Sequence, residues 1–125
     1  MRAIRNNVNQ APTFEQMPAA ALEMVAARFR ALGEPLRLRI LQSLEEGELS
    51  VSVLARVVGT TQPNISKHLR VLQQSGLIAR RQVGATAYYS ICDPSVRELC
   101  DLVCAGVRRR LAAQVDAFDA PSRRV

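Results

Sequence analysis

The fold is decided by residues 59–78, which read GTTQPNISKHLRVLQQSGLI. The pair Thr60-Thr61 can cap a helix, Pro63 suits its first turn, and Gly76 suits the position just past its end. At about 100° per residue, one face of this helix is apolar and is formed by Ile65, Leu69 and Leu72. A short helix before the turn at Gly59 completes a helix-turn-helix pattern.

The opposite face of the helix carries amide, hydroxyl and basic side chains. Asparagine and glutamine pair with adenine edges in the major groove, lysine and arginine pair with guanine, and hydroxyls and helix N-termini hold phosphates. We therefore predict DNA contacts from the cap and the outer face: Thr60, Thr61, Gln62, Asn64, Ser66, Lys67, His68 and Arg70. His68 has no partners at the spacing of metal ligands, so metal binding is not expected there.

Three helical segments are predicted before this element. In each, apolar residues recur at helical spacing and a glycine follows: residues 18–32, 35–44 and 50–58. After it, the strand-like runs 78–83 and 86–92 are separated by Gly84-Ala85, which fits a tight hairpin. Asp93-Pro94 then provides a cap and a first-turn proline for a long helix that continues to about Phe118.

This order, α-α-α-α-β-β-α, predicts a mainly helical winged helix-turn-helix fold in which the β-hairpin is the wing. Arg80 and Arg81 lie on the first wing strand, where they would contact the DNA backbone and add to the salt dependence of binding. The chain has 125 residues, so we predict one domain over residues 17–118, with a mobile arm over 1–16 and a frayed tail over 119–125.

The composition fits this prediction. Apolar residues make up 48% of the chain and aromatic residues only 4%, which favours packed helices over an aromatic-rich β-sandwich. The formal charge of +6 favours a polyanionic partner such as nucleic acid. No segment suits a signal peptide or a membrane span, so we expect a cytoplasmic protein with reduced cysteines and no membrane partner.

Four stretches carry a resemblance to a known family: ALGEPLRLRIL (31–41), QPNISKHLRVL (62–72), SGLI (75–78) and AYYSI (87–91). Over residues 29–111 the chain resembles the ArsR/SmtB family of bacterial winged-helix repressors. The resemblance implies a homodimer that is joined through its first and last helices. It also implies binding of double-stranded operator DNA as two half-sites about 34–36 Å apart.

Two sensor sites that are common in this family are absent from the sequence. Many members sense through a pair of cysteines in a segment that reads ELSVS here (48–52), with Ser50 and Ser52 in their place. Serine is a poor ligand for soft ions. Other members bind zinc through aspartate and histidine on the last helix, which has no histidine in this chain.

Three cysteines remain, Cys92, Cys100 and Cys104. The last two are four residues apart, so their Cβ atoms lie ~5–6 Å apart on one helical face. That separation suits two thiolates on one soft ion, and it is too wide for an unstrained disulfide, which needs about 3.8 Å. We predict that the cysteines hold trivalent arsenic or antimony as the inducer, with Cu(I) or Cd(II) as alternatives. Cys92 is the predicted third ligand. Cys100 lies ~9 Å along the helix from Pro94, so Cys92 of the partner subunit and a site of only two thiolates are the alternatives to a site within one chain.

Two other interpretations of the cysteines stay open. A persulfide or peroxide sensor would pair Cys92 with Cys100 or Cys104, and a repressor without an inducer would use the cysteines as core residues. An enzyme is not expected, because the sequence has no Ser/His/Asp set, no phosphate loop and no second histidine.

Overall fold

A computed structural model describes residues 13–119 of the chain. The predicted N-terminal arm and C-terminal tail lie mostly outside the described residues. Of the arm, Phe14–Gln16 forms a 3₁₀ turn, in which the Thr13 backbone N–H donates to Gln16 Oε1 at 3.3 Å. At the other end, the last helix includes Asp119. The domain limits at residues 17 and 118 stay predictions.

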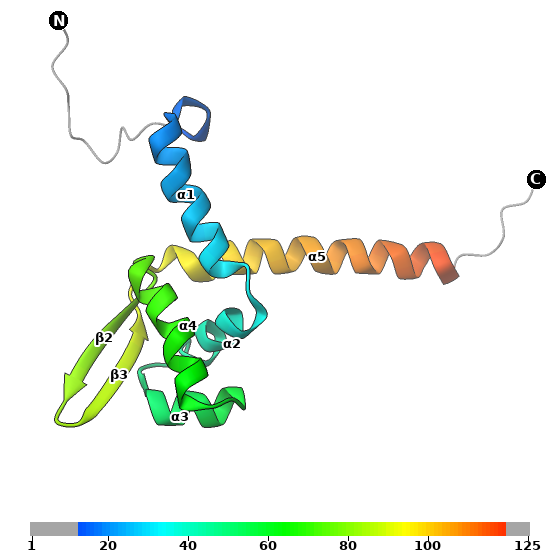
Figure 1. The fold of residues 1–125 in the computed structure, drawn as a ribbon. Helices are drawn as coiled ribbons and strands as arrows, with labels where there is room; N and C mark the ends of the chain where they lie inside the picture. Colours follow the sequence, from blue (N-terminus) through cyan, green and yellow to red (C-terminus); the bar gives the residue numbers. More distant parts are fainter. Residues whose placement is uncertain (1–12, 120–125) are drawn as a thin grey trace, which may run out of the picture.

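The elements follow the predicted order (Figure 1). They are α1 (Ala19–Leu32), α2 (Pro35–Ser43), β1 (Leu49–Ser50), α3 (Val51–Val58), α4 (Gln62–Gln74), β2 (Ile78–Val83), β3 (Thr86–Ile91) and α5 (Ser95–Asp119). The predicted fold class is thereby confirmed. The sequence does not predict β1, because two residues are too short a run to show an alternating pattern.

Hydroxyl caps begin α3 and α4, and a glycine ends α3 at the turn between them. Ser50 Oγ accepts a hydrogen bond from the Val53 N–H at 3.3 Å, and Thr61 Oγ1 accepts one from the Asn64 N–H at 3.3 Å. Gly59 ends α3 with a φ of 82°, a left-handed conformation that glycine adopts without strain. The sequence therefore places both ends of this turn.

The core lies where α2, α3 and α4 meet. Its largest fully buried side chains are aliphatic: Ile40, Leu54, Ile65, Leu69, Leu72 and Leu77. Three of them come from α4 and share one face of that helix, as their spacing predicts. Full burial of such a side chain contributes about 1.5–3 kcal/mol, so the burial of this face fixes the rotation of α4 about its own axis.

The strands form an antiparallel sheet in the order β1-β3-β2. β1 contributes two pairs, Leu49 with Tyr89 and Ser50 with Tyr88, whereas β2 and β3 pair along their full length. The β2–β3 hairpin consequently extends past the helices as a two-stranded ribbon (Figure 1). This ribbon is the predicted wing, and Gly84 turns it with a φ of 59°.

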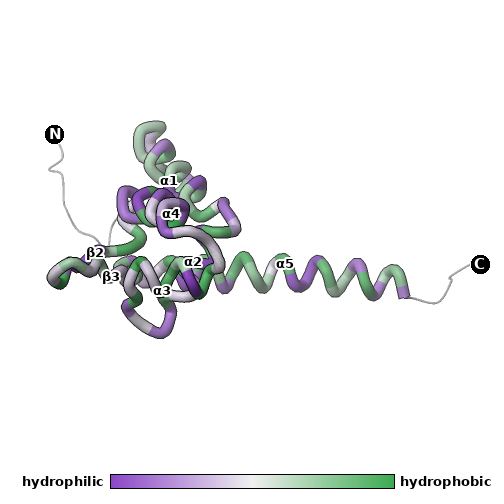
Figure 2. The backbone as a smooth tube through the Cα atoms, turned by 60° about the horizontal axis from the view of Figure 1, so that its bottom comes forward, coloured by the Kyte–Doolittle hydropathy of each residue, from purple (hydrophilic) through white to green (hydrophobic). Residues whose placement is uncertain are grey.

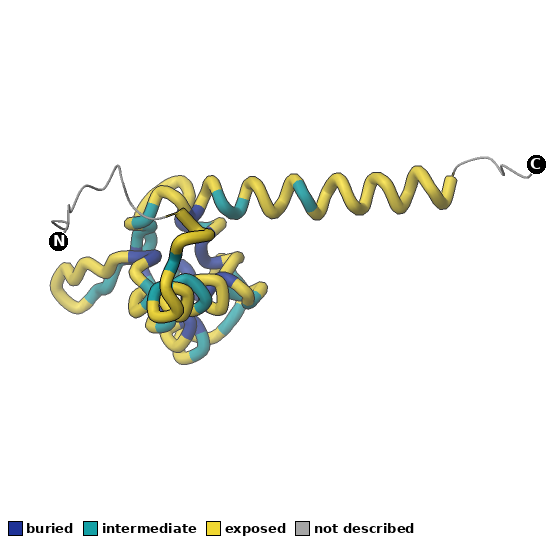
Figure 3. The backbone as a smooth tube through the Cα atoms, turned by 90° about the horizontal axis from the view of Figure 1, so that it is seen from above, coloured by how far each residue is buried: buried dark blue, intermediate teal, exposed yellow. Residues whose placement is uncertain are grey.

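Most of α5 lies outside the core: after its first turns the helix is exposed almost throughout (Figure 3). Apolar positions recur along it (Figure 2), and a row of large side chains on one face is more than half exposed: Val103, Val107, Leu111, Val115 and Phe118. α1 adds exposed apolar side chains, namely Leu22, Met24 and Phe29. Exposed apolar rows of this extent are typical of protein interfaces. No helix within residues 13–119 is both long and apolar enough to cross a membrane.

Candidate nucleic-acid interface and cysteine site

The helix-turn-helix formed by α3 and α4 presents a polar face to solvent. The exposed members of the predicted DNA-contacting set lie on α4 or at its cap: Thr61, Gln62, Ser66, Lys67 and Arg70. Thr60 and Asn64 are half-buried. Lys67 and Arg70 are three residues apart and therefore share a face of α4. This face combines two cations with amides and hydroxyls, which are the groups that read base edges and phosphates.

Two threonine hydroxyls hold the start of α4. Thr61 Oγ1 caps the backbone N–H of Asn64, and Thr60 Oγ1 accepts a hydrogen bond from Asn64 Nδ2 at 2.9 Å. These bonds orient the Asn64 amide in advance, which lowers the entropy cost of using it in recognition. Because both hydroxyls accept in these bonds, their O–H protons stay available to a phosphate.

His68 faces inward, in contrast to the prediction. Its side chain is only 8% exposed, and it lies on the same face of α4 as Ile65 and Leu72. Nδ1 is 3.2 Å from Arg37 Nη1, so Nδ1 accepts and the ring proton lies on Nε2. Burial lowers the pKa of His68 below its ordinary value, and the charge of Arg37 adds to this effect. His68 is therefore a neutral packing residue between α4 and α2 and not the predicted DNA contact.

Arg37, on the first turn of α2, links three helices. Its Nε donates to the carbonyl oxygen of Ala31 at 2.7 Å, and its Nη2 donates to that of Arg30 at 3.1 Å. Both carbonyls belong to the last turn of α1, and that of Arg30 also accepts a hydrogen bond from the Gly33 N–H at 3.2 Å. The third contact reaches His68 on α4. No local pattern predicts this link, since Arg37 and His68 are 31 residues apart.

Arg81 is held in place on the wing. Its Nε and Nη2 donate to the Glu48 carboxylate at 2.9 and 2.6 Å, and its guanidinium lies 5.4 Å from the centroid of the Tyr88 ring. The hydrogen bonds from Arg81 lower the pKa of Glu48. The neighbouring Arg80 hydrogen-bonds to Gln82. Arg81 is therefore engaged in an ion pair through two of its nitrogens, whereas Arg80 is bonded only to a neutral amide.

The start of α5 is tied to α1. Asp93 Oδ1 accepts hydrogen bonds from the Ser95 N–H at 3.0 Å and from Ser95 Oγ at 2.6 Å, while Oδ2 pairs with Arg28 of α1. The bond from the Ser95 hydroxyl is the main cause that lowers the pKa of Asp93, and Arg28 lowers it further. Asp93 thus serves as the predicted cap of α5 and also anchors that helix to α1.

The three cysteines lie in different environments. Cys92 is exposed just after β3, where its Sγ donates to the Gly76 carbonyl oxygen at 3.4 Å. Cys100 is half-buried and packs against the core, and Cys104, one turn further along α5, is exposed. Within residues 13–119, no three Cys, His, Asp or Glu side chains gather closely enough to hold a metal ion. The predicted three-cysteine site is therefore not formed within one protomer.

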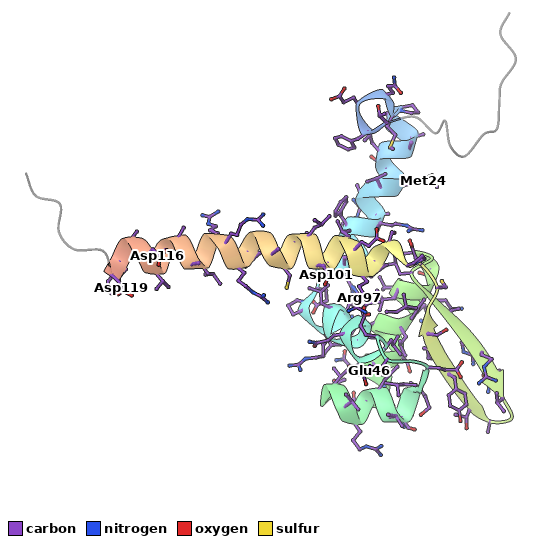
Figure 4. The ribbon with its side chains drawn as sticks, turned by 180° about the vertical axis from the view of Figure 1, so that it is seen from behind. Met24, Glu46, Arg97, Asp101, Asp116 and Asp119 are labelled. Atoms are coloured by element: carbon purple, nitrogen blue, oxygen red, sulfur yellow. The ribbon has the colours of Figure 1, made fainter. Side chains whose placement is uncertain are left out.

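Two acidic side chains, Glu45 and Asp101, act electrostatically on the Cys100 thiol. Arg97, one turn earlier on α5 and labelled in Figure 4, pairs with Glu45 at 3.3 Å, just after α2. Burial is the main cause that raises the pKa of the Cys100 thiol, and the negative charges of Glu45 and Asp101 raise it further. Cys100 is accordingly a protonated thiol at neutral pH, and a ligand must displace or accept its proton.

Comparisons with known proteins agree with this geometry. A family model described as a helix-turn-helix domain matches residues 32–81. The HTH-type transcriptional regulator NmtR of Mycobacterium tuberculosis is 38% identical over 85 residues, which are 68% of this chain and 71% of NmtR. A probable mercury resistance operon repressor of Streptomyces lividans is 34% identical over 84 residues, or 67% of either chain.

A solved structure shows the same fold. It is the homodimeric winged helix-turn-helix DNA-binding domain of Mb0332 from Mycobacterium bovis, described as a possible ArsR-family transcriptional regulator. The two chains superpose with a TM-score of 0.68 and are 31% identical, over 82% of this chain and 93% of that one. These similar proteins are all named as regulators or repressors, which confirms the prediction that the chain is not an enzyme.

The burial of His68 predicts a pH dependence of stability. Because its pKa is lowered in the folded state, the contribution of His68 to the free energy of unfolding is complete above the ordinary value of 6.5. It is lost as the pH falls from there through the lowered folded-state pKa. Urea unfolding between pH 7.5 and 5 should show this loss, and His68→Gln should reduce it. NMR titration of the single imidazole should give a pKa below 6.5, and a value at or above 6.5 would contradict the assignment.

Proposed function

The chain belongs to the ArsR/SmtB family of winged-helix transcriptional regulators, and we propose that it is a DNA-binding repressor released by a thiophilic inducer. The observation that carries the proposed sensor is the position of Cys100 and Cys104. They lie one turn apart on α5, where that helix leaves the core, and Cys100 contacts the core itself. A ligand that joins the two sulfurs would thus act on α5, which packs against the core at its start and carries the exposed apolar row along the rest of its length.

A second copy of this chain is the partner that we propose for the exposed apolar rows of α1 and α5. The domain of Mb0332, which shares this fold, is homodimeric. Dimerisation would bury side chains such as Val107, Leu111 and Phe118, whose exposure to water is unfavourable. It would also present two α4 helices to one DNA duplex, as recognition of two half-sites requires.

On each protomer we propose that α4 enters the major groove. Lys67 and Arg70 are the exposed cations of its outer face, and Asn64 and Gln62 offer amides at its N-terminal end. On the wing, Arg80 and Arg81 would contact phosphates of the flanking DNA backbone. Arg80 would exchange its hydrogen bond to Gln82 for a phosphate, and Arg81 would bind a phosphate beside or in place of Glu48. Under this proposal, phosphate contacts set the affinity, and the amides and cations of α4 read the sequence.

The chemistry of Cys100 favours trivalent arsenic among the candidate inducers. Cd(II) and Cu(I) bind thiolates, so each bound sulfur must lose a proton, and burial of Cys100 makes that loss unfavourable. Arsenous acid reacts differently: As(OH)₃ and two thiols give a dithiolate As–OH and two waters, with no net release of protons. The raised pKa of Cys100 therefore penalises the metal cations more than arsenic. The relative from Streptomyces lividans, named as a probable mercury resistance operon repressor, supports a thiophilic inducer.

A third sulfur for arsenic or antimony would have to come from Cys92 of the partner subunit. Within one protomer Cys92 is held at Gly76, beside the turn that follows α4. A methylated arsenical needs only two thiols and would be satisfied by Cys100 and Cys104. The exposure of Cys92 and Cys104 also suits a redox or persulfide sensor, which is the second candidate function.

Release requires only that the inducer bind the free dimer more tightly than the DNA-bound dimer. The first turn of α5 is anchored to α1 through Asp93 and to the end of α2 through Arg97. Drawing Cys100 toward Cys104 would shift this anchored turn and, with it, one protomer against the other. Couplings of this kind typically amount to ~1–3 kcal/mol, or about 5- to 150-fold in affinity.

The proposed role of α4 predicts a specific salt dependence. Arg70→Ala should weaken binding to upstream promoter DNA and reduce the slope of log affinity against log salt concentration by about one. Arg109→Ala removes the same charge from the projecting part of α5 and should leave the slope unchanged. Fluorescence anisotropy at several salt concentrations measures both. Equal slopes for the two variants would contradict the assignment of α4 as the DNA-reading helix.

The proposed sensor predicts release by arsenite. On the same promoter DNA, arsenite should lower the affinity of the reduced protein at one equivalent per subunit. Cys100→Ser and Cys104→Ser should abolish the effect, whereas Ala105→Ser, which adds the same hydroxyl one residue further on, should retain it. Cys92→Ser then distinguishes the two site types, because only a three-sulfur site loses its arsenite response.

Two results would overturn the arsenic proposal. One is that arsenite, antimonite, methylarsenite, Cu(I) and Cd(II) all leave the affinity unchanged. The other is release by a persulfide or peroxide together with a cysteine crosslink on a nonreducing gel, which would establish the redox sensor. If no ligand or oxidant releases DNA, the cysteines are packing residues of a repressor without an inducer.

A further inference from the structure

Arg37 connects the proposed dimer helix α1 to the DNA-reading helix α4. Its guanidinium donates two hydrogen bonds to the last carbonyls of α1 and a third to His68 Nδ1, at 2.7, 3.1 and 3.2 Å. Arginine suits such a junction, because its planar fork presents several N–H groups in fixed directions. A movement of α1 or α4 by a fraction of an ångström would therefore lengthen at least one of the three bonds.

The other contacts of α4 do not constrain it in the same way. Ile65, Leu69 and Leu72 are fully buried, but hydrophobic contacts are non-directional and tolerate small rotations and shifts of a helix. A hydrogen bond weakens steeply when its angle or length departs from the ideal. Arg37 and His68 thus add a directional constraint to a helix that is otherwise held by apolar packing.

We propose that Arg37 is a positioning residue for DNA recognition, which sets the orientation of α4 relative to α1 through His68. In a dimer joined through α1, that orientation also sets the distance and the helical phase between the two α4 helices. Arg37 would accordingly determine how strictly the protein selects the spacing of its half-sites. This inference rests on the proposed DNA-binding dimer and is independent of the cysteines and of the inducer.

Three charged groups act electrostatically on His68: Arg37 of α2, which contacts the ring, Glu34 at the N-cap of α2, and Lys67 of α4 itself. Protonation of Nδ1 would remove the acceptor that Arg37 uses and place a cation beside its guanidinium. The positioning contact therefore requires the neutral ring. Glutamine at this position retains a hydrogen-bond acceptor and does not titrate, whereas leucine offers no acceptor.

The test uses DNA that the wild-type full-length protein selects from a random duplex pool, without any inducer. Affinities are compared for the selected duplex and for two derivatives with one base pair added or removed between the half-sites. The wild type should prefer the selected spacing by about tenfold or more, since a displaced half-site loses contacts as a mismatched site does. Arg37→Met should reduce this preference to about threefold or less.

Matched variants separate positioning from other roles. Arg39→Met removes the same charge from an exposed position of α2 and should keep the wild-type preference. His68→Leu should behave like Arg37→Met, whereas His68→Gln should keep the preference and should not lose it as the pH falls through the lowered pKa of His68. If Arg37 instead bound a phosphate directly, the salt slope would fall by about one at every spacing, with the preference retained.

The inference is overturned if Arg37→Met and His68→Leu keep the wild-type spacing preference, or if Arg39→Met loses it equally. A variant that is merely destabilised would contain a smaller fraction of folded protein. Its affinities for all three duplexes would fall by the same factor, so its spacing preference would equal that of the wild type. Should Arg37→Met fail to fold, His68→Leu and Arg37→Lys decide by the same criterion. If the wild type selects no duplex at all, the proposed DNA binding fails first and this inference with it.

Discussion

The burial of one face of α4 is the constraint on which the rest of the structure depends. Ile65, Leu69 and Leu72 are fully buried, in a core to which α1, α2, α3, both wing strands and the start of α5 also contribute side chains. A helix that buries one face must expose the opposite one, and here the exposed face carries Lys67 and Arg70. The packing of a small core therefore determines which groups the protein can offer to DNA.

The same core also connects the proposed sensor to the DNA-reading surface. Cys100 packs against the cluster that buries α4, and Asp93 joins the start of α5 to α1 through Arg28. A ligand at Cys100 and Cys104 would not have to reach α4 directly. It would only have to favour one arrangement of α5 on this core over another, because a ligand shifts an equilibrium by its difference in affinity for the two states.

The local features of the fold can be predicted from the sequence because local residues determine them. Helical spacing locates α4, hydroxyl side chains locate its cap, and a glycine locates the end of α3. The turn at Gly84 likewise follows from the residue type that a tight hairpin requires. Each of these features depends on interactions within a few residues, so its signal lies in one short segment.

The features that the sequence does not predict depend on distant partners. The inward position of His68 is one such feature. A polar side chain is expected to face solvent, although the spacing of His68 from Ile65 and Leu72 places it on the buried face of α4. Its partner Arg37 is 31 residues away, and Glu48 and Arg81 are 33 residues apart, so neither pair leaves a local pattern. The separation of Cys92 from the α5 pair is different, because the rise of a helix from Pro94 to Cys100, ~9 Å, already indicates it; only the contact of Cys92 with Gly76, 16 residues earlier, has no local pattern.

In the proposed mechanism, thiol ligation on α5 and DNA binding by α4 are coupled. Calorimetric titration of arsenite into the free protein and into its complex with DNA measures this coupling. Arsenite should bind more weakly to the complex, by the same factor by which arsenite weakens DNA binding, because coupling between two sites is reciprocal. Equal arsenite affinities for the free protein and the complex would show that the two sites are not coupled, even if arsenite bound both tightly.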